Sequence, residues 1–206
     1  MPFVAPVAMQ AGWTRTGNAI YDVYSLFCHQ MAHRSYFLFG EQVMYTPEQF
    51  PLELTGRMGL DALALRAFRG DETFGWKVAW SDRMITMYGG FLLGAIMYWL
   101  ASKRWRIRPF PIWLAILFVL PMAIDGGSHF ISDFGGLTAG FRYTNAWLAN
   151  LTHGAFPDNF YVGDMLGSFN SWMRIITGLV FGIGVAGFVF PIIDYSMKST
   201  SAKQNS

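Results

Sequence analysis

Four segments of this chain are apolar over a length that suits a membrane-spanning helix. They run over residues 18–40, 84–101, 110–131 and 172–193. About 20 residues of helix cross the hydrocarbon core of a bilayer, so each segment predicts one span. Hydrophobic residues make up 53% of the chain and charged residues only 14%, which favours solvation by lipid over solvation by water. We therefore predict an all-α polytopic membrane protein, a four-transmembrane-helix bundle with two long non-cytoplasmic loops.

The rest of the chain adds little that would fold independently, so we predict a single membrane domain over residues 1–206. Within the first long loop, residues 60–69 carry apolar side chains at helical spacing beside Asp61, Arg66 and Arg69, which predicts a short amphipathic helix. The polar end of the chain, residues 198–206, is expected to be a disordered tail. The net charge of +2 gives no indication of nucleic acid as a partner.

The orientation in the membrane follows from one basic connection between the second and third spans. Lys103, Arg104, Arg106 and Arg108 lie there within six residues. Short basic loops stay in the cytoplasm. With four spans, this places both long loops outside and both termini in the cytoplasm of a multi-pass protein of the inner (plasma) membrane. The lipid bilayer is then the main partner, and other membrane subunits are a second expected class.

Polar residues converge on the outer half of this predicted bundle. An ionisable side chain in hydrocarbon costs about 2.5–3.5 kcal/mol, so such groups must face one another or a wet cavity. The polar residues of the first predicted span should therefore meet those at the outer ends of the other three spans. The predicted cluster consists of Cys28, His29, Gln30, His33, Arg34, Ser35, Asp82, Arg83, Asp125, His129 and Arg174.

Several short motifs recur in order along the chain. They read Cys28-His29-Gln30, Arg34-Ser35 and FLFG over 37–40, then GWKVA over 75–79 into Arg83, YGG over 88–90, LPMAIDGG over 120–127, and Arg174 followed by Thr177-Gly178. This combination resembles an uncharacterised family of predicted prokaryotic integral membrane proteins, a domain of unknown function. The resemblance implies the membrane architecture but brings no established activity.

The chain also departs from that family pattern. Relatives often carry a cysteine where this chain has Ser81, and some carry a second where it has Met84. Position 33 is often Glu in relatives and position 129 is often Gln, whereas both are His in this chain. If relatives hold a metal through their thiols, this chain lacks part of the ligand set.

Two pairs of residues in the cluster have spacing that suits metal ligands. His29 and His33 lie four residues apart, and so do Asp125 and His129. Residues four apart share one helix face, so the two pairs could bind a transition metal with Cys28 adjacent. The alternative is that these imidazoles form hydrogen bonds within the bundle.

The arginines offer two further hypotheses. A buried guanidinium needs a carboxylate, which predicts ion pairs joining Arg34 or Arg83 to Asp125 or Asp82. Arg34, Arg83 and Arg174 could instead hold a phosphate, a carboxylate or a lipid head group. The alternative to such an anion site is that these side chains snorkel to the interface.

The sequence leaves two classes of function open. In the first, the protein is a non-catalytic membrane component, either an accessory subunit or a binder of a small ligand. In the second, it is a metal- or thiol-dependent membrane enzyme or redox protein that uses Cys28, His29, His33, Asp125 and His129. A small transporter is a third alternative, although no inverted repeat supports it.

Overall fold

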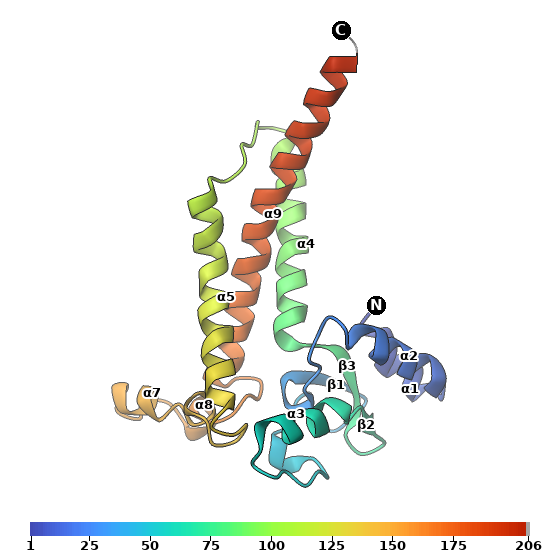
Figure 1. The fold of residues 1–206 in the computed structure, drawn as a ribbon, viewed down its shortest axis with the longest axis vertical. Coiled ribbons are helices and arrows are strands. Elements are labelled where there is room, and N and C mark those ends of the chain that lie inside the picture. The colour runs from blue at the N-terminus through green and yellow to red at the C-terminus, as the bar shows by residue number, and fades with distance from the viewer. Residues whose placement is uncertain (205–206) are drawn as a thin grey trace. The chain divides into compact units, whose positions relative to one another are not determined.

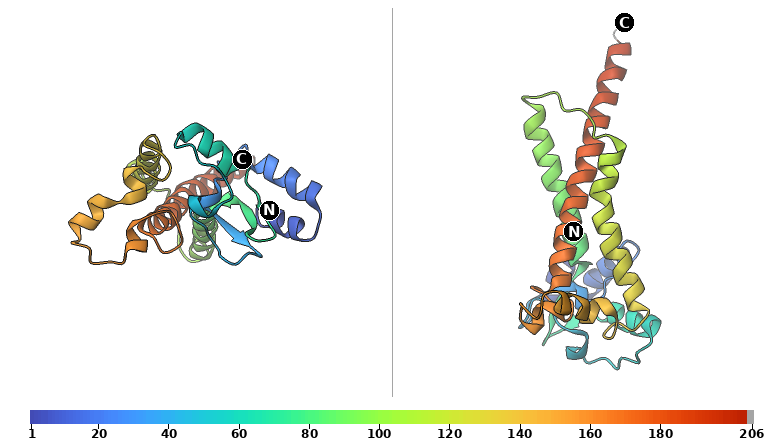
Figure 2. Two further views of the ribbon diagram at one scale, coloured as in Figure 1. Left: turned by 90° about the horizontal axis from the view of Figure 1, so that it is seen from below. Right: turned by 90° about the vertical axis from the view of Figure 1, so that its left-hand side faces the viewer.

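The computed structural model describes residues 1–204, with side chains described through residue 197. The chain divides into two compact units (Figures 1 and 2). Unit 1 contains Met1–Met84 and Gly127–Met173, and unit 2 contains Ile85–Gly126 and Arg174–Ser206. The boundaries between the units fall inside three long helices, so each of these helices contributes residues to both units.

Among the residues that the structure describes, three helices are long and apolar enough to cross a membrane, judged by length and composition. They are α4 (Asp82–Ser102), α5 (Ile112–Asp133) and α9 (Phe169–Gln204). They cover the second, third and fourth predicted spans. Pro121 and the pair Gly126-Gly127 do not end α5, which continues to Asp133. The end of the chain that we predict to be disordered is helical to Gln204, and residues 205–206 lie outside the described part.

Glycines bring the backbones of α4 and α9 close together in unit 2. A Cβ atom placed on Gly90 would lie 2.5 Å from the carbonyl oxygen of Leu179, and one on Gly182 would lie 2.2 Å from that of Met87. Gly89 is the neighbour of Gly90, yet nothing lies within 4 Å of its added Cβ. Small residues drive helix association in lipid, where no hydrophobic force acts between helices. Gly90 and Gly182 therefore lie where the two helices cross.

The predicted first span, residues 18–40, is wrong. This stretch contains the end of α2 (Thr14–Tyr24), the short 3-10 helix η1 (Ala32–Arg34) and strand β1 (Ser35–Leu38). Gln30 lies between α2 and η1 with φ of 51°, a left-handed conformation that interrupts a helix. The protein is mostly helical, but it is not the predicted all-α bundle of four spans.

A small antiparallel sheet replaces that span in unit 1. Its strand order is β1-β3-β2, with β2 at Gly70–Asp71 and β3 at Gly75–Ser81. Ser35 pairs with Ser81 and Phe37 with Lys77. Aromatic residues favour strands, and the run Tyr36-Phe37-Leu38 supplies them where the sequence pattern had suggested helix. The sheet thus joins the motif around residue 35 to the one around residue 77.

Short helices complete unit 1. They are α1 (Val4–Gln10), η2 (Pro47–Gln49), α3 (Met58–Ala67), α6 (Phe141–Thr144), α7 (Ala146–Leu151) and α8 (Asp158–Tyr161). Helix α3 occupies the region where we predict an amphipathic helix over residues 60–69. The two stretches that the sequence presents as long loops are therefore folded segments.

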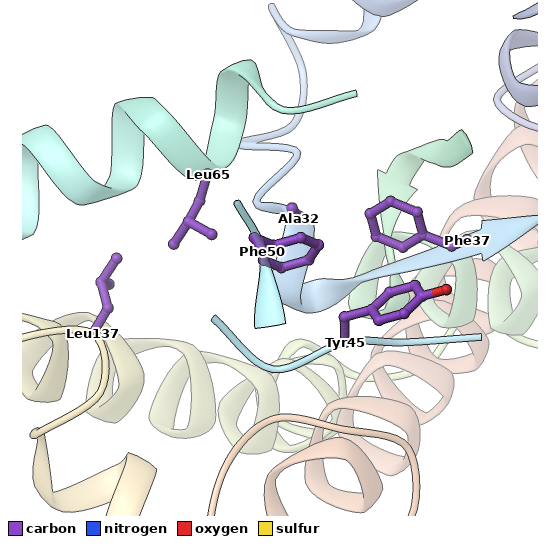
Figure 3. Close-up of a cluster of buried hydrophobic side chains, with 6 residues drawn as sticks. All are labelled: Ala32, Phe37, Tyr45, Phe50, Leu65 and Leu137. Carbon is purple, nitrogen blue, oxygen red and sulfur yellow. The ribbon is translucent and has the colours of Figure 1, made fainter. Parts of the chain in front are cut away.

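The main hydrophobic core of unit 1 is largely aromatic (Figure 3). Phe37, Tyr45 and Phe50 pack with Ala32, Leu65 and Leu137. The ring centroids of Phe37 and Tyr45 lie 5.2 Å apart in an edge-on arrangement, which suits the opposite charges of ring edge and face. Leu137 comes from the segment after α5, so this core ties the two sequence portions of unit 1 together.

Candidate functional site: a buried charge network in unit 1

The centre of the candidate site is the guanidinium of Arg34, at the end of η1. Its Nη1 and Nη2 donate to the two carboxylate oxygens of Asp133 at 3.0 and 2.9 Å. Its Nε donates to Oδ2 of Asp164 at 2.9 Å. All three guanidinium nitrogens are therefore engaged, and the contact with Asp133 is the paired, parallel kind that fixes both side chains.

The two carboxylates come from parts of unit 1 that are distant in sequence. Asp133 is the last residue of α5, and Asp164 follows α8. The Asp164 side chain is only 2% exposed, and that of Arg34 is 15% exposed. Nε2 of His33, which is fully buried, lies 3.6 Å from the same Asp164 oxygen. The network therefore holds a guanidinium, two carboxylates and an imidazole away from solvent.

The electrostatics keep Arg34 charged. Burial alone would lower the pKa of its guanidinium, but the charge of Asp164 and the hydrogen bonds and charge of Asp133 outweigh burial. The pKa of Arg34 is consequently raised above its ordinary value. A buried charge of this kind is tolerated because its partners are ionised and correctly placed.

A set of asparagine hydrogen bonds fixes the segment that carries Asp164. The side-chain amide of Asn170 donates to the carbonyl oxygens of Arg142 and Gly163 at 2.6 and 2.9 Å. The amide of Asn145 donates to the carbonyl oxygen of Tyr161 at 2.8 Å and to Asn170. Buried backbone carbonyls need such donors, and here they also set the position of the loop.

Arg142 and His129 form a second buried contact. A guanidinium nitrogen of Arg142 lies 3.2 Å from Nε2 of His129. Since arginine only donates, Nε2 must accept, which assigns the neutral His129 tautomer with its proton on Nδ1. The backbone N–H of Arg142 donates to Oγ of Ser132, beside Asp133. Ser132 directly precedes Asp133, so the Arg142 segment is attached to the chain next to a carboxylate of the Arg34 network.

Cys28 lies in a separate polar environment in unit 1. The backbone N–H groups of Gln30 and Ser81 both approach its sulfur at 3.5 Å, and Oγ of Ser81 lies 3.6 Å away. The left-handed conformation of Gln30 bends the chain so that its own N–H faces the sulfur. The Gln30 side chain is held in turn by the carbonyl oxygen of Tyr21 at 3.0 Å.

Lys77 is fully buried on β3. Its Nζ donates to the carbonyl oxygens of Gln30 and Arg66, each at 2.7 Å. Burial, helped by the nearby charge of Arg69, lowers the pKa of Lys77 to about 7, while Cys28 acts in the opposite direction. A neutral Lys77 amine has two N–H groups, and each can donate to one of the two carbonyl oxygens.

The structure separates several of the residues in the predicted cluster. Cys28, Gln30, His33 and Ser35 are buried in unit 1, whereas His29 is exposed. His29 and His33 therefore do not share a helix face.

The other predicted members lie at the ends of the long helices. Asp82 and Arg83 begin α4 in unit 1, where the Asp82 carboxylate accepts the Arg83 backbone N–H at 2.7 Å. Asp125 and Arg174 are buried within unit 2. There Oγ1 of Thr86 donates to the Arg174 carbonyl oxygen at 3.3 Å.

Two chemical predictions are corrected by these positions. No group of three or more His, Cys, Asp or Glu side chains that could hold a metal ion occurs among the residues that the structure describes. The proposed ligands His29, His33, Asp125 and His129 therefore do not assemble a metal centre. The ion pair of Arg34 exists, but its partners are Asp133 and Asp164 where the sequence suggests Asp82 or Asp125.

Sequence reasoning missed four residues that matter here: Asp133, Asp164, Arg142 and Lys77. Asp133 continues the four-residue spacing of Asp125 and His129, and this signal could have found it. Asp164 lies in an irregular segment and Arg142 in the four-residue helix α6, and neither segment is long enough to show a periodic pattern. Lys77 sits inside one of the motifs, but nothing in a single sequence reveals that it is buried.

Comparisons with known proteins agree with this architecture. Residues 69–188 match the model of a family described as predicted membrane protein (DUF2085). The uncharacterized protein MJ1492 of Methanocaldococcus jannaschii is 27% identical over 158 residues, covering 73% of this chain and 76% of that protein. No solved structure matches the chain. Because the family model matches more than half of its residues, the chain belongs to the DUF2085 family of predicted membrane proteins.

Proposed function

We propose that this protein is a non-catalytic component of the plasma membrane and that the Arg34 network is the structural clamp of unit 1. The observation that carries this proposal is that Arg34 pairs with two carboxylates of unit 1 through all three of its guanidinium nitrogens. Each of its three nitrogens donates to a buried carboxylate. Three of the five N–H donors of Arg34, one on each nitrogen, are bound to protein carboxylates that neutralise its charge, so little of that charge is left to attract an anionic substrate.

The cavity in unit 2 supports the same conclusion. It is an open depression of about 290 Å3, lined by apolar residues of α5 that include the exposed Ile112 and Ile116, together with Phe188 of α9. Ligand sites usually combine apolar walls with a few polar groups that orient the ligand. This cavity has walls suited to a hydrocarbon chain and supplies no side chain for chemistry.

The proposal includes a membrane orientation. The basic loop over residues 103–108 is cytoplasmic by its charge, and Nζ of Lys103 lies 3.4 Å from the ring centroid of Trp99, a pairing typical of the membrane interface. Three crossings put the two termini on opposite sides. The C-terminus is then cytoplasmic, while the N-terminus and unit 1 are non-cytoplasmic. This revises the expectation of two cytoplasmic termini, which depended on four spans.

A deletion strain complemented with variants tests the structural role. Arg34→Lys keeps the positive charge but loses the planar guanidinium, and Asp164→Asn keeps the side-chain shape but loses the negative charge. If the network only stabilises unit 1, every variant that fails to complement the deletion strain should also contain less folded protein. Size-exclusion chromatography and thermal unfolding measure the amount of folded protein. A variant that is folded at the wild-type level yet inactive would show that the network does chemistry.

The surroundings of Cys28 favour a second candidate, a thiol-dependent protein. Two backbone N–H groups lie 3.5 Å from its sulfur, and Cys28 interacts electrostatically with the Lys77 amine. The thiolate is the reactive form of cysteine. The rate of maleimide labelling against pH tests this candidate. Lys77→Met should slow the labelling near pH 7 if the amine assists, whereas an unchanged profile would leave Cys28 as a packed residue.

A further inference from the structure

The segment between α5 and α9, residues 134–168, buries most of its charged side chains and exposes many of its large apolar ones. Its charged residues are Arg142, Asp158 and Asp164, and the first and last of these are buried. Large apolar side chains occupy its exposed surface instead. The exposed residues are Phe134, Phe141, Trp147, Leu151, Phe156, Val162 and Leu166, with Leu151 at 70% and Leu166 at 54% exposure.

In water this distribution would be unfavourable. Each exposed apolar side chain gives up the stabilisation of burial, and soluble monomers rarely expose apolar surface over a whole segment. Charged groups are the last to be buried in a soluble domain. The pattern is instead that of a segment surrounded by a medium less polar than water.

The backbone of the segment agrees with such a medium. Helix α7 begins at Ala146 and has no buried residue. Its end is nevertheless closed by internal hydrogen bonds, since Thr152 N donates to Leu148 O at 2.9 Å and Gly154 N to Ala149 O at 2.9 Å. The hydroxyl of Thr152 also turns back to Leu148 O, at 2.9 Å. Backbone polar groups must be satisfied internally where water is scarce.

Two occupants would suit an apolar surface, a protein partner or lipid, and the observations favour lipid. A protein interface is expected to offer about one hydrogen bond per 100–200 Å2, yet the hydroxyl of Thr152 at the end of α7 donates internally. The chain on each side of the segment is a candidate membrane span. Tryptophan and other aromatic residues gather at the bilayer interface, and Trp147 packs edge-on against Phe169 at the start of α9.

We propose that residues 134–168 lie in the interfacial layer of the bilayer that α5 and α9 cross, with Trp147, Leu151 and Leu166 in contact with lipid. The exposed polar residues of the segment suit this layer because they are mostly uncharged. They are Thr144, Asn150, His153 and Asn159, with Asp158 as the charged exception. Interfacial helices bury their apolar face about 5–10 Å into the boundary between head groups and acyl chains.

Site-directed spin labelling of the full chain tests this proposal. Cys28→Ser removes the single native cysteine, and one new cysteine is then introduced at Leu151 or at Leu166. The matched control is Glu53→Cys, an exposed position in unit 1 between η2 and α3. Each variant is labelled with a nitroxide, reconstituted in phosphatidylcholine vesicles, and compared for collision with oxygen and with a water-soluble nickel chelate.

Oxygen concentrates in lipid and the chelate in water. We expect the ratio of oxygen to chelate collisions to be several-fold higher at 151 and 166 than at 53. Ratios equal to that of the control would place the segment in water and overturn the proposal. Loss of collisions with both reagents at 151 and 166 would indicate a protein neighbour, such as a second copy, and would also overturn it. The two sites are independent, so a misfolded variant at one leaves the other decisive.

Discussion

Replacement of Arg34 by methionine should be the most damaging single change in unit 1. Methionine keeps a long unbranched side chain but removes the charge that Asp133 and Asp164 face at 2.9–3.0 Å. Deleting one partner of a buried pair leaves the other charge without compensation, which costs about 3–5 kcal/mol. For a chain of this size, that corresponds to a fall in Tm of about 6–20 °C.

The matched control is Arg69→Met. Arg69 pairs with Asp22 at 2.5 Å, but the Asp22 side chain is 69% exposed. Pairs of this kind contribute about 0–1 kcal/mol, since water already solvates both charges. Thermal unfolding of both purified variants in one detergent, followed by near-UV circular dichroism, makes the comparison. If Arg34→Met lowers Tm no more than Arg69→Met does, the network is not a clamp and our reasoning fails.

Three further predictions concern other parts of the chain. Gly89→Ala should stabilise by about 1 kcal/mol through helix propensity, whereas Gly90→Ala should destabilise by about 1–3 kcal/mol because its Cβ meets backbone of α9; equal Tm shifts would contradict the close helix crossing. Ser81→Cys should form a disulfide with Cys28 on mild oxidation, since the two side chains are in contact, and unchanged mobility on a non-reducing gel would argue against that contact. Lys77 has a folded-state pKa of about 7, below its unfolded value, so the unfolded chain binds the extra proton above pH 7 and stability should rise with pH by about 1.4 kcal/mol per unit. Lys77→Met should remove that rise when Tm is measured from pH 7 to 9.

The three candidate spans could be predicted from sequence because their signal is local. Each is an uninterrupted apolar run of sufficient length, judged from the sequence alone. The first predicted span failed because apolar content alone does not separate a helix from a strand. The aromatic run near Phe37 pairs with β3, and this pairing depends on residues some 40 positions away.

The candidate site shows the same division. The sequence predicts an ion pair for Arg34 because a charged side chain among apolar residues needs a partner of opposite charge. The identity of that partner depends on how the segments after α5 fold, and Asp164 carries no local signal of its role. The burial of Lys77 likewise results from the approach of the Gln30 and Arg66 carbonyls, which come from two other segments.

The central claim is that residues 18–40 belong to a folded unit outside the membrane and that the chain crosses the bilayer three times. Epitope tags at the two ends of the full chain, probed with antibody on intact and permeabilised cells, measure this directly. We expect the N-terminal tag to be reached without permeabilising the plasma membrane and the C-terminal tag only after it. Detection of both tags only after permeabilisation would contradict the account, because it would restore an even number of crossings.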